Sequence, residues 1–577
     1  MPTISYPRSS TGRIAALSLI AAPIGVLGAL SAWVLVKLIG LLTSIALFHQ
    51  VSTIPPPMSD LHPGPWLFLV AAAGGLAVSV IARWVPTVRG HGIPEAMEAV
   101  VERQSVINVP TAIGKPTSAS IAIGTGGPFG AEGPIVVTGS AIGSLLGQIL
   151  PVSPAERRIL LACGAAAGTA GIFGTPFAAV LLPLELLLFE FSTRSLVPLF
   201  VAAAVATAIR SGLLDGGAFV PQVTFTTPHG LELLWYVALG LVCGLLAVVI
   251  CKGLFWIEAG YRTLPISEFW HPIIGALGFA AVGMFEPRVL GVGYAVIGAE
   301  LAGTIVGGAL LVLGVAKLLA WWVALGSGTS GGTLAPLLFI GGAFGGWLGS
   351  IAVHAGIPVD PRAFALVAMA AVFGASTRAV LTGIVFTIEI VAAPAMAIPL
   401  MLATAAAAMV ATSLASDSLM TEKLTRRGLR IHHHAEVDVL RSTRVADVMS
   451  RDVVTIDAGA TVGAARTVLA EGPHSAYPLV TADDTLAGMV SRSDLLADGV
   501  PDTQPVDEIA ATDVVALPPT ASVLDALDTI VRESVEHVPV VNDGCLVGIC
   551  TRTDVLRARA RKLNEERPAP SLRLRRS

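Results

Sequence analysis

The stretch GTGGPFGAEGPIVVTG, from Gly124 to Gly139, places one carboxylate, Glu132, among glycines and apolar residues. Proline is favoured in the first turn of a helix, and glycine allows a close or unusual backbone path. We therefore expect a helix to begin near Pro134. A carboxylate at the depth of a bilayer is unfavourable unless other groups compensate its charge, so the fold has to supply partners for Glu132.

The composition indicates a membrane protein. Of the 577 residues, 54% are hydrophobic and only 13% are charged, whereas an ordinary soluble domain has about 25% charged residues. The windows Leu233–Cys251 and Ile390–Ser416 carry no charge, and Leu318–Val359 has His354 as its only titratable group. Because roughly 20 apolar residues span a bilayer as a helix, we predict a polytopic membrane protein.

The amino-terminal segment predicts a first membrane helix that is retained. Arg8 and Arg13 precede an apolar run that continues from Ile14 to Phe48, which is longer than the apolar region of a signal peptide. Its basic flank favours a cytoplasmic amino terminus. The basic tail, residues 563–577, favours a cytoplasmic carboxyl terminus as well, so we expect an integral, multi-pass protein of the cell membrane.

The chain changes character near Thr421, from apolar to charged and alternating. His432–His434 lie at this junction, with no cysteine or carboxylate at a spacing typical of a metal finger, so we read them as linker. The five cysteines have no CxxC spacing and predict no disulfide framework. The expected domains are a membrane domain (1–420), a linker (421–440), a soluble module (441–562) and a basic tail (563–577).

The membrane domain contains an internal repeat. GHGIP at Gly90 matches GVGYA at Gly291, PIVVTGSAIGSLLG at Pro134 matches PLLFIGGAFGGWLG at Pro336, and AVLLPLEL at Ala179 matches GIVFTIEI at Gly383. The offsets are 201, 202 and 204 residues. They predict two related halves, at about 15–215 and 230–420, an arrangement typical of transporters that bind their substrate between the halves.

Three segments combine glycines with a proline and an apolar run, so we expect helices to open at Pro94, Pro134 and Pro336. The free N–H groups and the positive dipole ends of such helices form an anion site without a basic side chain. Glu132 lies where it can compete with a mobile anion for these donors, and can leave when it is protonated. The sequence therefore predicts a gated anion site.

The three segments also carry a resemblance to a family. GHGIPE (Gly90–Glu95), GAEGP (Gly130–Pro134) and GGTLAP (Gly331–Pro336) resemble the signature motifs of CLC chloride channels and proton/chloride exchangers, as do LTGIVFTIEI (Leu381–Ile390) and Lys115. The resemblance implies a mostly α, inverted-repeat membrane fold and chloride as the transported ligand. It also implies a homodimer in which each subunit has its own pore, with no required cofactor and no nucleic-acid partner.

The resemblance assigns roles to individual residues. Glu132 matches the gating glutamate, and Lys115 matches a cation that shapes the electrostatics of the ion path. His91 stands where the family usually has a serine, and Met420 where it usually has a tyrosine. The expected anion-binding residues are His91, Gly92, Ile93, Gly133, Thr333, Leu334 and Met420.

One departure bears on proton coupling. Exchangers of this family commonly carry two adjacent glutamates, the second of which accepts the internal proton, but here Glu185 is followed by Leu186. A leucine cannot carry a proton. We therefore expect a channel that conducts chloride passively, with proton-coupled exchange as the alternative. Glu185 and Glu190 are the candidates for a proton path, and His91 or water are possible substitutes.

The soluble module contains its own repeat, in which GMVSRSD and GICTRTD recur 60 residues apart. This pattern resembles a pair of CBS domains, at about 441–500 and 503–562, with an α/β fold. The resemblance implies that Ser491 and Thr551 meet phosphates and that Asp494 and Asp554 meet the ribose of an adenine nucleotide. The alternative is a pair that binds no nucleotide and serves dimer contact.

An intramembrane protease and a magnesium channel are the alternatives to an anion transporter. GTSG (Gly328–Gly331) is similar to the serine motif of rhomboid-type proteases, with His354 as a conceivable base. A magnesium channel would need a cluster of carboxylates for a hard cation, but the membrane core has isolated carboxylates only. We therefore expect no enzymatic activity, no catalytic residues and no metal site.

Overall fold

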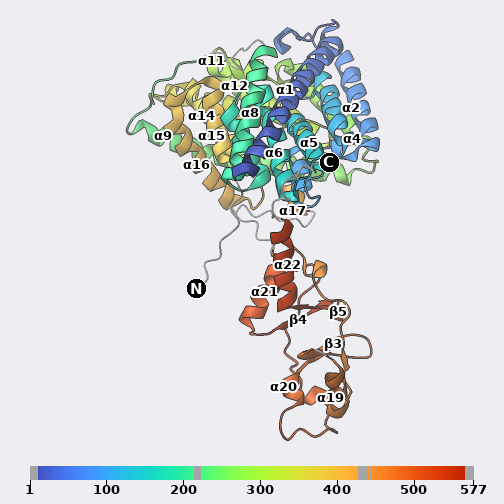
Figure 1. The fold of residues 1–577 in the computed structure, drawn as a ribbon. Coiled ribbons are helices and arrows are strands. Elements are labelled where there is room, and N and C mark those ends of the chain that lie inside the picture. Colours follow the sequence, from blue (N-terminus) through green and yellow to red (C-terminus); the bar gives the residue numbers. More distant parts are fainter. Residues whose placement is uncertain (1–10, 214–222, 427–439, 441–442, 473, 566–577) are drawn as a thin grey trace. The chain divides into compact units, whose positions relative to one another are not determined.

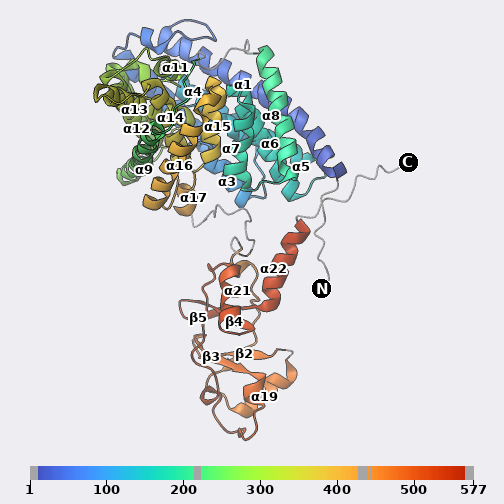
Figure 2. The ribbon, with the colours of Figure 1, turned by 90° about the vertical axis from the view of Figure 1, so that its left-hand side faces the viewer.

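The computed structural model describes residues 11–213, 223–426, 440, 443–472 and 474–565. The chain divides into two compact units, a membrane unit that extends to Ala435 and a tail unit, Glu436–Arg567. Figure 1 and Figure 2 show a helical bundle for the first unit and a mixed α/β arrangement for the second. The expected linker histidines, the basic tail beyond residue 565 and Arg8 lie outside the described residues.

The membrane unit consists of two halves with the same order of helices. The first half contains α1 (Thr11–Phe48), α2 (Trp66–Trp84), α3 (Ile93–Val101), α4 (Val109–Gly124), α5 (Glu132–Ile149), α6 (Pro154–Phe173), α7 (Pro176–Pro183), which continues as a π-helical turn (Leu184–Leu188), and α8 (Thr193–Leu213). The second contains α9 (Glu232–Thr263), α10 (His271–Phe285), α11 (Tyr294–Ala302), α12 (Gly308–Gly326), α13 (Leu334–His354), α14 (Pro361–Thr377), α15 (Val380–Val391) and α16 (Ala397–Leu414). The short helix α17 (Glu422–Arg426) follows.

The helices have the lengths that a membrane fold requires. Within the described residues, seven are long and apolar enough to cross a bilayer, among them α1, α9 and α13. The apolar run Leu318–Val359 belongs to two helices, because the chain turns at Ser327–Thr333 between α12 and α13. The helices expected at Pro94, Pro134 and Pro336 begin one or two residues before each proline.

Glycines allow the helices of each half to pack backbone against backbone. On α5, a Cβ added to Gly139 would strike the carbonyl oxygen of Gly164 on α6. On α13, a Cβ added to Gly345 would lie 2.6 Å from the carbonyl oxygen of Phe364 on α14. Equivalent helices of the two halves thus pack in the same way, with small residues at the contact, as is usual in membranes.

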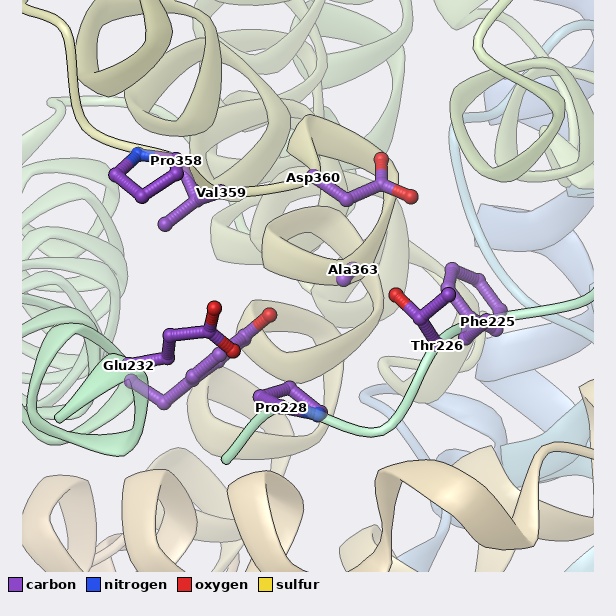
Figure 3. Close-up of a pocket in the computed structure, with 9 residues that line it drawn as sticks. Phe225, Thr226, Pro228, Glu232, Pro358, Val359, Asp360 and Ala363 are labelled. Carbon is purple, nitrogen blue, oxygen red and sulfur yellow. The ribbon is translucent and has the colours of Figure 1, made fainter. Parts of the chain in front are cut away.

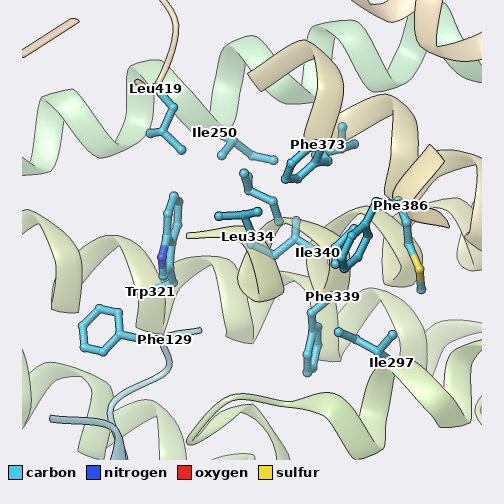
Figure 4. Packing of buried hydrophobic residues seen from close by; sticks show 14 of the residues in the cluster. Phe129, Ile250, Ile297, Trp321, Leu334, Phe339, Ile340, Phe373, Phe386 and Leu419 are labelled. Atoms are coloured by element: carbon cyan, nitrogen blue, oxygen red, sulfur yellow. The ribbon is translucent and has the colours of Figure 1, made fainter. Parts of the chain in front are cut away.

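Large side chains fill the space between these close contacts (Figure 4). The labelled ones come from α9, from α11 to α15, from the loop before α5 and from the segment between α16 and α17, and all of them are buried. The labelled members include Phe129, Ile250, Trp321, Leu334, Phe339, Phe373 and Phe386.

The tail unit contains two similar repeats. The first has β1 (Ile456–Asp457), α19 (Val462–Glu471), β2 (Ala476–Val480), β3 (Leu486–Ser491) and α20 (Arg492–Leu495). The second has α21 (Val523–Arg532), β4 (His537–Asn542), β5 (Cys545–Thr551) and α22 (Arg552–Glu565). In the first, β2 pairs with β1 in parallel and with β3 antiparallel; in the second, β4 and β5 are antiparallel. This is the α/β pattern expected for the soluble module.

Candidate functional site

The two halves of the membrane unit meet at their glycine-rich loops. Gly130 and Gly332 exchange two backbone hydrogen bonds, of 3.1 and 2.8 Å. A parallel bridge also links Gly90 to Ser330. These contacts bring the three glycine motifs of the sequence to one place, although the first and the last are separated by more than half of the membrane unit.

Three helices begin at this junction, namely α3 at Ile93, α5 at Glu132 and α13 at Leu334. The approach of α3 to α5 depends on Gly92, whose φ is +94° and whose added Cβ would lie 2.7 Å from the carbonyl oxygen of Gly133. A side chain at this position would be strained and would also strike the backbone. The helix starts are thus close to each other, as the anion-site prediction requires.

Glu132 is fully buried at the junction. Its Oε1 accepts a hydrogen bond of 2.9 Å from the Tyr294 hydroxyl, at the start of α11 in the other half. Its Oε2 lies beside Gly332, where an added Cβ would come within 2.8 Å of it. The Ala335 backbone and the Lys317 ammonium also interact favourably with the carboxylate charge. Glu132 therefore lies against the start of α13, where it can compete with an anion.

Four buried polar atoms at the junction, one of them from Glu132 itself, have no hydrogen-bond partner within the described residues. They are His91 Nδ1, Glu132 Oε2, Ser330 Oγ and Thr333 Oγ1. Buried polar atoms normally find partners, so four such atoms at one junction need an explanation. Three of them are able to donate a hydrogen bond, and an anion or water that passes the junction would satisfy them.

His91 is buried, and groups from α4, from α17 and from the segment between α16 and α17 act on its ring. Lys115 from α4 and Lys423 from α17 are close enough to act on its ring electrostatically, and the Leu419 backbone contacts it as well. The neighbouring Met420 is fully buried, and its backbone N–H donates to Ser418 Oγ at 3.2 Å. The predicted His91 and Met420 therefore lie in one region, together with two cationic side chains.

The ammonium group of Lys115 is hydrogen-bonded to the backbone before α3. Its Nζ is buried and donates to the carbonyl oxygens of Val88 (2.9 Å) and Gly90 (2.8 Å). Sequence analysis missed that Lys317 repeats this contact in the second half, where its Nζ donates to Val289 (2.9 Å) and to Gly291 (2.8 Å). The signal was available, because Lys317 follows Lys115 at the repeat offset of 202 residues.

The proton-path candidates have other partners. Glu185 accepts hydrogen bonds from the backbone of Leu381 (2.9 Å) and Thr382 (2.8 Å), so it caps the start of α15. Glu389 makes the reciprocal contact with the start of α7, through Phe177 and Ala178. Glu185 thus has a structural role at the start of α15.

Leu186 and Glu190, which follow Glu185 in the chain, have different surroundings. Leu186 is buried among apolar side chains. Glu190 lies in the segment before α8 and accepts a hydrogen bond from Ser192 at 3.4 Å. Leu186 therefore provides no carboxylate, and the hydrogen bond of Glu190 is to a residue of its own segment.

In the tail unit, the predicted nucleotide residues form two equivalent pairs. Asp494 accepts hydrogen bonds from the backbone and hydroxyl of Ser491, and Asp554 accepts the same two from Thr551. In each pair one carboxylate oxygen, Oδ2, makes both contacts and fixes the start of a helix. These hydrogen bonds give the four residues a structural role, and their contact with a nucleotide stays a prediction.

The geometry argues against the protease alternative. Ser330 precedes α13, whereas His354 ends it. A helix of 21 residues is about 30 Å long, so His354 cannot act as a base for Ser330. The described residues also contain no group of three or more His, Cys, Asp or Glu that could hold a metal ion.

A pocket lies elsewhere in the membrane unit (Figure 3). It is bounded by the segment before α9, by the first turns of α9 and by the start of α14, and Glu232 and Asp360 line it. Asp360 already accepts hydrogen bonds from Arg362, and Glu232 accepts one from the His229 backbone. None of the predicted site residues lines this pocket, so the candidate site is the junction around Glu132.

Comparison with known proteins gives the family. Residues 74–412 match the model of the voltage gated chloride channel family, and residues 445–498 and 506–561 match the CBS domain. A relative from Ralstonia nicotianae, named putative chloride channel protein ClcB-like, is 30% identical over 338 residues, which are 56% of this chain and 78% of that protein. A relative from Vibrio campbellii, named H(+)/Cl(-) exchange transporter ClcA, is 29% identical over 56% of this chain and 72% of its own length.

Solved structures have the same fold. A slow cyanobacterial Cl⁻/H⁺ antiporter covers 72% of this chain and 97% of its own, with a TM-score of 0.61 and 24% identity. A eukaryotic CLC transporter covers 93% of this chain and 97% of its own, with a TM-score of 0.62 and 18% identity. The chain belongs to the CLC family of voltage gated chloride channels, and it carries a pair of CBS domains. It is a membrane protein of a family that transports chloride.

Proposed function

We propose that this protein exchanges chloride for protons across the cell membrane and that Glu132 is the gate. The observation that carries the proposal is the buried carboxylate of Glu132 at the junction of the two halves, beside the start of α13 and the unpartnered donors of His91 and Thr333. When it is charged, it occupies the place of an anion. When it is protonated, it loses its attraction to the helix N-termini and leaves that place to chloride.

Exchange was the alternative in the sequence analysis, and the comparisons support it better than passive conduction. The Vibrio relative is named an exchange transporter, and so are relatives from Yersinia that are 29% identical. A single carboxylate that takes up a proton whenever it releases its anion site links the two movements at that step. Both points favour proton-coupled exchange over passive conduction of chloride.

A chloride channel is the second candidate, and Leu186 favours it. The position that follows Glu185 has no proton acceptor, and Leu186 is buried. The Ralstonia relative is named a putative chloride channel protein. In a channel of this kind Glu132 would still open and close the path, but protons would not be carried across the protein.

The anion would meet donors from three helix starts and from one unusual side chain. We propose that chloride binds the backbone N–H groups at Thr333 and Leu334 and at the Gly92–Ile93 and Gly133 turns, with His91 in place of a hydroxyl. Met420 contributes an apolar wall, because a thioether is at best a weak hydrogen-bond acceptor. Lys115 and Lys423 favour an anion in this region through their charge.

The remaining features belong to the same proposal. The protein is a homodimer with one path per subunit, and both of its termini are cytoplasmic. Light scattering of the purified protein would give the mass of a dimer if the protein is a homodimer.

The CBS pair binds an adenine nucleotide through Ser491, Asp494, Thr551 and Asp554. Equilibrium dialysis with labelled ATP and with AMP would test this binding.

The experiment that tests the main proposal is a flux measurement on purified protein in liposomes under a chloride gradient. Internal chloride and internal pH are followed together. We expect protons to move uphill at a fixed ratio to chloride. If chloride moves and the internal pH does not respond, the protein is a channel and the proposal of exchange is wrong.

A further inference from the structure

We propose that Tyr294 is a positioning residue that holds Glu132 in the anion site and sets the pH at which the gate opens. The inference rests on the proposed role of Glu132 as the gate. The hydroxyl of Tyr294 donates to Glu132 Oε1 at 2.9 Å, so a side chain from the second half acts on the gate of the first. The sequence analysis gave Tyr294 no role.

The position of Tyr294 follows from the repeat. GVGYA of the second half corresponds to GHGIP of the first. Tyr294 therefore takes the place that Ile93 has in the first half, at the first residue of a short helix. Gly293 precedes it with a φ of +90°, as Gly92 precedes Ile93 with a φ of +94°. The same turn thus presents an apolar side chain in one half and a hydroxyl in the other.

The surroundings of Tyr294 restrict its ring. Lys317 donates to the carbonyl oxygens of Val289 and Gly291, which fixes the turn before α11. The ring of Phe173 meets the ring of Tyr294 edge-on, with the centroids 6.3 Å apart and the planes at 72°. Phe386 in turn packs against Phe173 at 4.8 Å. The hydroxyl is therefore held at one place by contacts from both halves.

A hydrogen bond from Tyr294 stabilises the charged form of Glu132 more than the protonated form, because a charged acceptor makes the stronger bond. Among the described residues, Lys317 and Tyr294 are the titratable groups that act on this carboxylate, and both favour its charge. Without the hydroxyl, Glu132 would take up a proton at a higher pH and would leave the site there. The gate would then open under less acidic conditions.

Tyr294→Phe tests this with little risk to the fold, since the ring and its contact with Phe173 remain. A hydrogen bond to a charged group contributes about 1.5 kcal/mol or more, which is about tenfold in an equilibrium. We expect the pH of half-maximal chloride flux into liposomes to rise by about one unit. Tyr261→Phe is the matched control, because Tyr261 donates to the Val323 carbonyl at 3.2 Å, outside the site, and should leave the midpoint unchanged.

Measurements in the Glu132→Gln variant test this inference separately from the proposal that Glu132 is the gate. In Glu132→Gln the side chain cannot titrate, so adding Tyr294→Phe should change nothing. If Glu132→Gln removes the pH dependence but Tyr294→Phe alone behaves like the wild type, Glu132 is the gate and Tyr294 does not set its pH. An equal shift by Tyr294→Phe in both backgrounds would overturn the inference as well. If Glu132→Gln keeps the wild-type pH profile, both the gate and the inference are wrong.

Discussion

The two halves of the membrane unit have the same scaffold but different chemistry. Each has a buried lysine that binds two carbonyl oxygens, a glycine with positive φ before a short helix, and a glutamate that caps a helix of the opposite half. Yet the first residue of α5 is Glu132, whereas the equivalent first residue of α13 is Leu334. The contacts that both halves share stabilise the fold. The positions at which the halves differ, such as Glu132 and Leu334, are the candidates for function.

The same comparison applies to the neighbouring positions. His91 corresponds to Val292, and Ile93 corresponds to Tyr294. Each half therefore contributes polar side chains at the positions where the other is apolar. An exact two-fold repeat would place a carboxylate at both helix starts, and the two negative charges would repel each other. The asymmetry allows one carboxylate to be surrounded by donors.

The largest effect is expected for the buried lysines. Lys115→Met and Lys317→Met each remove the ammonium donor from two buried carbonyl oxygens, and a buried carbonyl oxygen left without a partner costs about 1–3 kcal/mol. The Gly90 carbonyl keeps only a long hydrogen bond, of 3.4 Å, from the Gly331 N–H. We expect both variants to lower the thermal midpoint of the detergent-purified protein, by similar amounts. Lys252→Met, an exposed position on α9, serves as the control. A loss of stability in one half alone would break the proposed equivalence of the two halves.

The reciprocal glutamates give a smaller effect. Glu185→Gln and Glu389→Gln keep an acceptor for the helix start but remove a charge that is favourable there, which contributes about 1 kcal/mol. The thermal midpoint should fall equally in both, and neither change should alter the ratio of protons to chloride in liposomes. Loss of proton movement in Glu185→Gln only would show that Glu185 belongs to a proton path after all.

The smallest effect is expected in the tail unit, which has its own repeat. Asp494→Asn and Asp554→Asn weaken the contacts that fix the starts of α20 and α22, at about 1 kcal/mol or less each. We expect a lower thermal midpoint for the tail transition, and a greater decrease for Asp554, whose side chain is 6% exposed. Binding of labelled ATP, followed on the same two variants, shows whether the carboxylates also contact a nucleotide.

Much of this arrangement could be predicted because local sequence determines it. Glycines before a proline marked the starts of α3, α5 and α13, and the repeat offsets gave the two halves. The contact between Tyr294 and Glu132 could not be predicted in this way. It joins residues 162 positions apart, and neither side chain carries a local signal for the other. Glu389 was likewise seen only as a repeat match, because its partner helix begins in the opposite half.

The central claim is that Glu132 is the gate of the anion site. The most direct measurement compares chloride and proton fluxes of the wild type, Glu132→Gln and Glu389→Gln in liposomes over a range of pH. The account predicts that Glu132→Gln conducts chloride at a rate independent of pH and moves no protons, while Glu389→Gln follows the wild type. If Glu132→Gln keeps the pH profile and the proton flux of the wild type, the account is contradicted.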